Sequence, residues 1–290
     1  MQYVDIDAFY SDGYAVVQVF DSAEAARYAA IADEYVSAGK AFDFQVVREL
    51  PAVLVHPVVQ GAVGQILGGG DLVLECWRLM AVEVGENYRQ GWHRDIPLGM
   101  AWLPEEMAAR LLHAIAAGAW WHNNVQCNLA LNADACYWTI PGSNRRAFTD
   151  EERAVFDPIH AAEIHAASRP EETDAGISGG VCVEIEPGQM ILQNNVSIHR
   201  GWGTPIQEPR RTLHFGFHNA ERPPTWHFRR RLNDAYEELP PEQRDSMHPV
   251  MRSMLERRAE HMRQMTPSQS GDVAWREANL ELFFSGGLQG

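Results

Sequence analysis

The centre of the chain decides the fold at residues 125–131, which read Val-Gln-Cys-Asn-Leu-Ala-Leu. Every second side chain is Val, Cys or Leu, whereas Gln126, Asn128 and Ala130 take the alternate positions, and this is the period of a strand with one face in a core. A turn at residues 132–135 leads to an apolar run at 137–140, which stops at Pro141-Gly142-Ser143. Two such runs around a short turn predict a β-hairpin.

Short apolar runs separated by turns also lie on both sides of this predicted hairpin. Strands are expected at residues 14–20, 72–80, 181–185, 190–193 and 211–217. Helices are expected after Asp21, which precedes Glu24 by the capping-box spacing, and at residues 51–67, 104–117 and beyond Pro224. Residues 150–176 are polar and irregular, as a lid would be. We therefore predict a mainly β protein with helical cladding, with a barrel domain over residues 1–220 and a helical extension over 221–290 that packs on it.

Composition excludes several functions. A net charge of −15 over 290 residues argues against a nucleic-acid partner, because polyanion binding needs clustered positive charge. No apolar run is long enough to span a membrane, and the first residues do not form a signal peptide. The four cysteines lie far apart, which favours reduced core thiols. A soluble, cytoplasmic protein is the default expectation.

The most informative short motif is Trp92-His93-Arg94-Asp95. Side chains at i and i+2 of a strand share a face, so His93 and Asp95 can bind adjacent positions of one metal ion. His199, in a glycine-flanked segment, would complete a two-His, one-carboxylate centre of the kind that holds non-haem Fe(II) and leaves coordination positions open. An isolated His-x-Asp pair is weak evidence, since 12 histidines make chance matches common.

The order of several motifs gives stronger support. The start at residues 9–17, the motif around His93, the central hairpin with Pro141-Gly142-Ser143-Asn144, and His199 followed by Arg210 resemble the phytanoyl-CoA dioxygenase family of Fe(II)/2-oxoglutarate oxygenases. The resemblance spans residues 9–217, although Asn144 stands where the family usually has histidine. It implies a double-stranded β-helix, which is a cupin-like jelly roll.

The resemblance also implies roles for single residues. His93, Asp95 and His199 would bind Fe(II), and Arg210 would pair with 2-oxoglutarate while its neighbour Arg211 faces away into a structural ion pair. Gln126 and Asn128 are candidate donors to the co-substrate or substrate, and hydrogen bonding between strands explains them equally well. Many relatives have serine two residues after the second histidine. This chain has Gly201, so Thr204 is the candidate for the lost contact.

The resemblance implies oxidation of a C–H bond by Fe(II), 2-oxoglutarate and O₂, with succinate and CO₂ as co-products. A small metabolite or natural product is the expected substrate, and the candidate pocket walls are Trp92, Arg94, Trp138 and Trp202. Two alternatives remain: a cupin-like metalloenzyme that isomerises or epimerises without oxidation, and a catalytically inert binding barrel. The C-terminal helices either cover the barrel or form a homodimer interface, and the sequence leaves both open.

Overall fold

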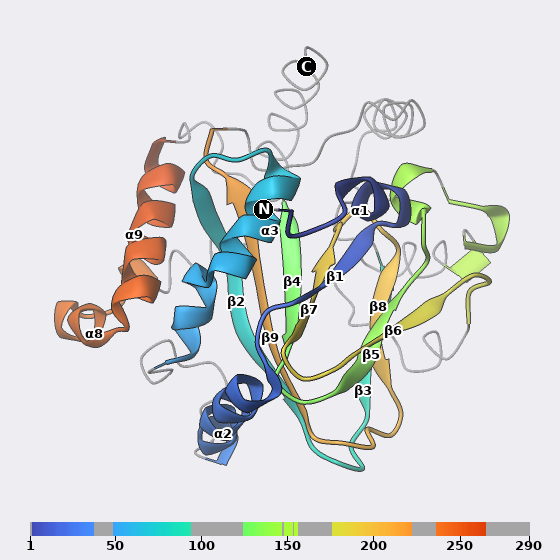
Figure 1. Cartoon of the computed structure of the whole chain (residues 1–290), viewed down its shortest axis with the longest axis horizontal. Coiled ribbons are helices and arrows are strands. Elements are labelled where there is room, and N and C mark those ends of the chain that lie inside the picture. Colours follow the sequence, from blue (N-terminus) through green and yellow to red (C-terminus); the bar gives the residue numbers. More distant parts are fainter. Residues whose placement is uncertain are drawn as a thin grey trace.

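The computed structural model describes residues 2–37, 49–93, 124–146, 148–152, 154–155, 176–221 and 236–264. Its centre is a pair of antiparallel sheets (Figure 1). Sheet A has the strand order β1-β7-β4-β9-β2, and sheet B has the order β3-β8-β5-β6. The strands of sheet A are β1 (Tyr14–Gln18), β2 (Leu72–Val82), β4 (Val125–Ala130), β7 (Gln189–Gln193) and β9 (Arg210–Asn219). Those of sheet B are β3 (Tyr88–His93), β5 (Asp134–Thr139), β6 (Val181–Ile185) and β8 (His199–Gly203).

The chain passes repeatedly from one sheet to the other. Strands that follow each other in sequence, such as β2 and β3 or β8 and β9, lie in different sheets, and each strand pairs with partners from distant parts of the chain. The β-hairpin predicted at residues 125–140 is wrong in its pairing, because β4 joins sheet A and β5 joins sheet B and the two strands do not pair with each other. This winding is the jelly roll, or double-stranded β-helix, and it confirms the predicted fold class.

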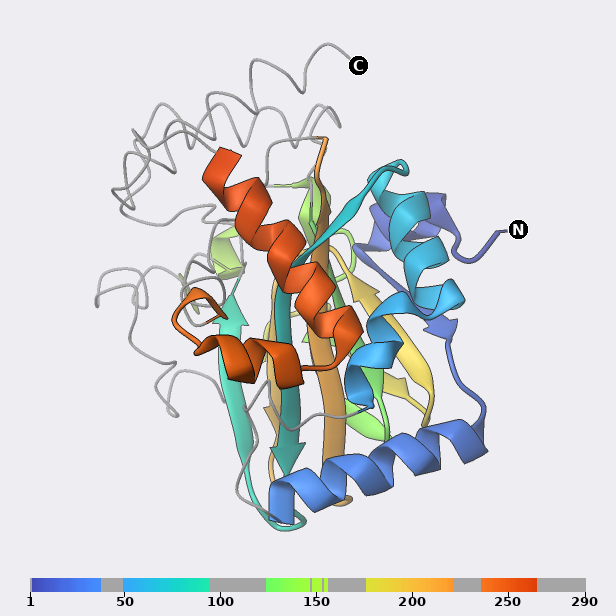
Figure 2. The same cartoon turned by 90° about the vertical axis from the view of Figure 1, so that its left-hand side faces the viewer.

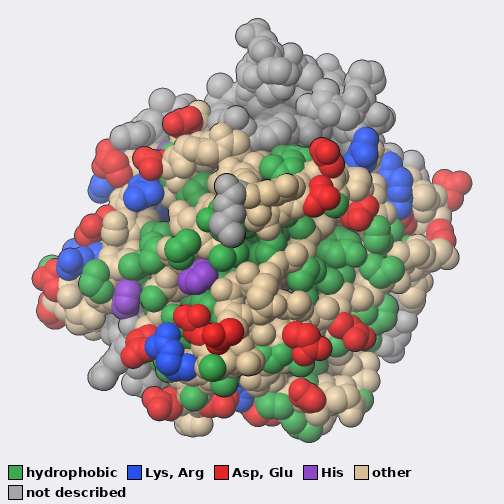
Figure 3. Space-filling model, viewed as in Figure 1, with side chains coloured by type: hydrophobic (Ala, Val, Ile, Leu, Met, Phe, Trp, Pro, Cys, Tyr) green, Lys and Arg blue, Asp and Glu red, His purple; other side chains and the backbone are tan. Residues whose placement is uncertain are grey.

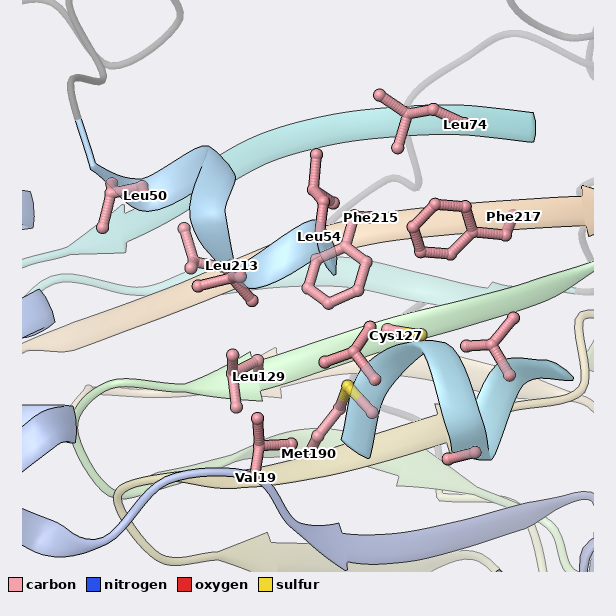
Figure 4. Close-up of a cluster of buried hydrophobic side chains, with 14 of the residues drawn as sticks. Val19, Leu50, Leu54, Leu74, Cys127, Leu129, Met190, Leu213, Phe215 and Phe217 are labelled. Atoms are coloured by element: carbon pink, nitrogen blue, oxygen red, sulfur yellow. The ribbon is translucent and has the colours of Figure 1, made fainter. Parts of the chain in front are cut away.

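The two faces of sheet A differ in chemistry. Cys127 and Leu129 of β4, with Leu213 and Phe215 of β9, join a large apolar cluster on the outer face (Figure 4). The alternate positions of these strands, which carry Gln126, Asn128, Thr212 and His214, point to the inner face. The strand predicted from the alternation at residues 125–131 is confirmed, and both faces of this strand are buried.

Helices cover the outer face of sheet A (Figure 2). The larger ones are α2 (Ser22–Ser37), the 3-10 helix η1 (Leu50–Val55), α3 (Pro57–Leu67) and α9 (Pro249–Gln264). The short helices are α1 (Ile6–Asp12), whose Phe9 joins the same apolar cluster, η2 (Ser143–Arg145) and α8 (Pro241–Ser246). The Asp21 side chain accepts from the Glu24 amide at 2.8 Å, which confirms the predicted cap. The single helix expected over residues 51–67 is instead two helices, because His56 precedes a proline and takes an extended ψ of 134°.

The last described helix docks on the edge strand of sheet A. The buried Arg258 of α9 donates to the Leu74 carbonyl at 3.0 Å and pairs with Glu75 at 3.2 Å, where β2 has a bulge. The helix predicted at residues 104–117, much of the proposed lid at 150–176 and the basic run at 229–231 lie outside the described residues.

Within the described ranges, no helix has the length and apolar character needed to cross a membrane. The molecular face in Figure 3 has dispersed acidic side chains and only a few separate basic ones, so the described residues form no concentrated basic patch on it.

Candidate metal centre

The structure brings together two of the three predicted metal ligands. His93 ends β3 and His199 begins β8, and these residues are register partners in sheet B. Their ring centroids are 4.2 Å apart. Residues more than a hundred positions apart in sequence are thus neighbours because the jelly roll pairs β3 with β8.

Both imidazoles are oriented in the same way. Nδ1 of His93 lies 2.8 Å from the Gly91 carbonyl oxygen, and Nδ1 of His199 lies 2.9 Å from that of Ser197. A carbonyl oxygen only accepts, so each Nδ1 carries the proton and each Nε2 keeps its lone pair. A backbone carbonyl on the outer nitrogen is the usual support of a metal-binding histidine. Both residues therefore fit a divalent cation through Nε2.

The backbone that presents His199 is held by the end of β5 and by the turn that follows it. Ser143 Oγ accepts from the Ile198 amide at 2.8 Å, and Thr139 Oγ1 donates to the Ile198 carbonyl at 3.1 Å. Asn144, at the position where the family usually has histidine, donates to the Tyr10 carbonyl at 2.8 Å. Ser143 and Thr139 thus hold the residue before His199 in place, and Asn144 ties the turn to α1, roles that the sequence alone did not indicate.

Asp95, the predicted carboxylate ligand, and its neighbour Arg94 lie outside the described residues. Within the described part of the chain, no third histidine, cysteine or carboxylate joins His93 and His199 in a metal-binding group. The assignment of Asp95 therefore stays a prediction.

A carboxamide side chain lies beside Nε2 of each imidazole, and that of Gln193 is buried whereas that of Gln90 is half-buried. The amide nitrogens of Gln193 and Gln90 lie 2.9 Å and 3.4 Å from Nε2 of His199 and His93, respectively. Gln193 also donates to Gln126 and accepts from Asn128, at 3.3 Å each. Gln126 and Asn128 therefore face the barrel interior as expected and link sheet A to the metal centre through Gln193, which sequence reasoning missed.

Arg210 lies inside the barrel and has a carboxylate partner. Its Nε donates to Asp134 Oδ2 at 2.8 Å, both side chains are buried, and Thr212 also hydrogen-bonds that oxygen. Burial alone would raise the pKa of Asp134, but the Arg210 charge and hydrogen bonds from Thr212, Arg210 and the Cys136 amide bring it below its usual value. Burial would lower the pKa of Arg210, and Asp134 raises it, so both groups are charged. Arg210 Nη1 is buried without a hydrogen-bond partner in the described structure.

Tyr88 fills the space beside Gly201. The Arg210 guanidinium carbon lies 4.3 Å from the Tyr88 ring centroid, and a Cβ added to Gly201 would overlap the same ring. Tyr88 Oη donates to Gln90, so contacts run from Arg210 to the metal-binding histidines. Thr204 is exposed in the turn after β8, which corrects the expectation that it replaces the missing serine, because an exposed hydroxyl cannot hold a buried carboxylate.

Arg211 points the other way, as predicted. Its Nε pairs with Asp33 of α2 at 2.7 Å and its Nη2 pairs with Glu83 at 2.6 Å. The opposite orientations of Arg210 and Arg211 follow from the two-residue period of β9.

Three of the predicted pocket walls face away from the barrel interior. The Arg200 guanidinium lies over Trp92, Trp138 and Trp202, at 4.6, 5.2 and 4.8 Å from their rings. Arg200 and Trp202 alternate with His199 and Gly201 along β8, and Trp138 is the register partner of Arg200. This corrects the expectation that these tryptophans line the same pocket as the histidines: they form a cation–π cluster on the outer face of sheet B.

Known proteins resemble this chain in their structure and not in their sequence. No known family model and no curated protein sequence matches this chain. Among solved structures, apo ThoJ, described as a non-haem monooxygenase, is 19% identical with a TM-score of 0.51 and covers 74% of this chain and 78% of its own. Fe-bound EctD from S. alaskensis is 16% identical with a TM-score of 0.51, over 74% of this chain and 76% of its own.

SnoK, an alpha-ketoglutarate-dependent carbocyclase from nogalamycin biosynthesis, is 15% identical with a TM-score of 0.50, over 74% of this chain and 83% of its own. These likenesses show that the chain has the jelly-roll fold on which such non-haem iron enzymes are built. At this identity the function must be argued from the site.

Proposed function

We propose that this protein is a non-haem Fe(II)- and 2-oxoglutarate-dependent oxygenase that oxidises a C–H bond of a small metabolite or natural product. The observation that supports the proposal is the pair of histidines whose Nδ1 atoms each lie beside a backbone carbonyl and whose rings are 4.2 Å apart. In the proposed centre their two Nε2 atoms bind one iron ion. Asp95, two residues beyond His93, supplies the carboxylate of a two-His, one-carboxylate centre.

When iron, 2-oxoglutarate and O₂ are bound, such a centre couples decarboxylation to succinate and CO₂ with oxidation of the substrate. The task of the protein is to position its ligands and exclude water. Asp134 holds Arg210 through Nε, which leaves the buried Nη1 for the distal carboxylate of 2-oxoglutarate. Gln126, Asn128 and Gln193 offer neutral hydrogen bonds beside the metal-binding histidines. The likeness to SnoK, a natural-product enzyme, supports the substrate class.

A second candidate is a metalloenzyme that isomerises or epimerises its substrate without 2-oxoglutarate. One observation favours it: Asp134 already neutralises Arg210, so a second carboxylate would bring excess negative charge into a buried site. The remaining alternative, an inert binding barrel, predicts no metal-dependent chemistry at all.

Substrate-independent turnover distinguishes these functions. Purified protein is supplied with Fe(II), ascorbate, 2-oxoglutarate and O₂, and succinate is quantified against the same mixture with His199→Ala. We expect slow succinate formation by the wild type that the variant lacks. Tight iron binding without succinate above the variant level would favour the non-oxidative metalloenzyme, and absence of iron binding would favour the inert barrel.

A further inference from the structure

Arg78 lies in the middle of β2 and faces the barrel interior. Its neighbours Trp77 and Leu79 belong to the apolar cluster on the outer face, so Arg78 takes the opposite face. Met80, two residues further on the same face, contacts Tyr88 Oη at 3.6 Å across the barrel. Arg78 and the metal-binding histidines therefore face the same enclosed space.

Arg78 differs from the buried arginines that form salt bridges. Arg210, Arg211 and Arg258 each pair with a carboxylate. Arg78 is half-buried, its Nε is buried without a hydrogen-bond partner, and no carboxylate of the described residues lies within 4.0 Å of its guanidinium. A partly desolvated cation without a counter-charge is costly, and an anionic ligand would remove that cost.

A polar strip leads from Arg78 to the metal centre. His214, the cross-strand partner of Arg78, hydrogen-bonds Asn128 Oδ1 through Nδ1 at 2.7 Å. Asn128 donates to Gln193, whose amide lies 2.9 Å from Nε2 of His199. The steps from Arg78 to His214, Asn128 and Gln193 each cross to a neighbouring strand of sheet A, about 5 Å away, and the last step reaches His199 of sheet B. The strip therefore spans a length comparable with a small molecule. Its side chains offer hydrogen-bond donors and acceptors, and the Arg78 guanidinium gives it one charged end.

We infer that Arg78 binds the carboxylate of the primary substrate, which makes the substrate a small organic acid whose reacting carbon lies toward His199. This inference rests on the proposed function, in which Arg210 serves 2-oxoglutarate. The two arginines stand at different heights in the barrel, because Arg210 begins β9 and pairs with Val82, whereas Arg78 is opposite His214. One fixed guanidinium suits a monoanionic carboxylate through two parallel hydrogen bonds.

The test uses the anaerobic complex of the full-length protein with Fe(II) and saturating 2-oxoglutarate. A panel of alkyl and aryl monocarboxylates, including phenylacetate, is titrated beside the corresponding neutral amides, including phenylacetamide, by calorimetry. The variants are Arg78→Gln, Arg78→Lys and the matched control Arg89→Gln, which removes one positive charge from the exposed face of β3. A parallel titration measures the dissociation constant of 2-oxoglutarate for each variant.

We expect at least one carboxylate to bind the wild type more tightly than its amide, and Arg78→Gln to weaken that binding about tenfold or more, as the loss of a charged hydrogen bond predicts. Amide binding and 2-oxoglutarate binding should be unchanged, Arg78→Lys should retain part of the preference, and Arg89→Gln should retain all of it. Weaker 2-oxoglutarate binding in Arg78→Gln, or equal binding of every carboxylate and its amide, would overturn the inference.

Failure of the proposed function would look different. If the wild type forms no complex with Fe(II) and 2-oxoglutarate, the same carboxylate and amide titrations are made on the protein without them. A carboxylate preference that depends on Arg78 would then support the anion site even though the oxygenase proposal had failed, and its absence would overturn both.

Discussion

Arg210 and Asp134 form a buried ion pair between sheets A and B, with Nε and Oδ2 2.8 Å apart. The pair joins the first residue of β9 to the first residue of β5, which are 76 positions apart in sequence. Because Asp134 takes only the Nε side of the guanidinium, the ion pair fixes the orientation of the Nη atoms that we assign to the co-substrate.

Asp134→Asn should lower the free energy of unfolding at pH 7 by about 3 kcal/mol, because it leaves Arg210 charged and buried without a counter-charge. The folded pKa of Asp134 lies below its unfolded value of about 3.9, so the stabilisation is complete above that value and is lost as the pH falls toward the folded pKa. Urea unfolding of wild type and variant at pH 7 and pH 3 should therefore show a smaller difference at pH 3. An equal difference at both values would contradict the ion-pair account.

Arg210→Gln should raise the dissociation constant of 2-oxoglutarate by about 10- to 100-fold, which corresponds to about 1.5–3 kcal/mol for hydrogen bonds to a charged group. The measurement is calorimetric titration of the Fe(II)-loaded protein under anaerobic conditions. Arg89→Gln, which loses a positive charge on the opposite face of sheet B, is the control and should bind like the wild type. Unchanged affinity in Arg210→Gln would remove this residue from the co-substrate site.

Gly201→Ser should destabilise the protein by about 1–3 kcal/mol, because the added side chain overlaps the Tyr88 ring. Tyr88→Ala frees that space, so Gly201→Ser should cost less in the Tyr88→Ala background than in the wild type. Thermal unfolding of the two single variants and the double variant measures this coupling. Additive effects would show that Tyr88 does not fill the space beside Gly201.

The thiols should react slowly in the folded protein. Burial, the main cause, raises the pKa of Cys136 to about 12 and that of Cys182 to about 11. Because the thiolate is the reactive form, iodoacetamide should label these cysteines at pH 8 much more slowly in the native protein than in guanidinium chloride. Peptide mapping at timed intervals measures both rates, and rapid native labelling of Cys136 would contradict the burial.

Local periodicity in the sequence was sufficient to predict most of the strands, whereas the jelly-roll arrangement followed from the resemblance. The alternation at residues 125–131, the cap at Asp21 and the opposite orientations of Arg210 and Arg211 all depend on neighbours within a few residues. The pairing of β3 with β8 was not predicted, and the resemblance to a known family indicated only that His93 and His199 act together.

Two kinds of contact were not predicted. Tyr88 and Asp134 reach Arg210 only after distant parts of the chain come together, so no spacing in the sequence marks them. Gln193 lies only six residues before His199, and their contact depends on how the chain passes from sheet A to sheet B between β7 and β8. The error at Trp202 was avoidable, because it lies three residues from His199 on β8, and an odd separation places it on the opposite face. The expectation for Thr204 was wrong because the turn beyond β8 carries this residue to the surface.

The most direct test of the oxygenase assignment is anaerobic addition of Fe(II) and 2-oxoglutarate to the wild-type protein, followed by visible absorption spectroscopy. We expect the weak charge-transfer band of 2-oxoglutarate chelated to iron, absent in His199→Ala and in Asp95→Ala. If the wild-type protein binds iron at His93 and His199 but forms no band at saturating 2-oxoglutarate, it is not an oxygenase of this class.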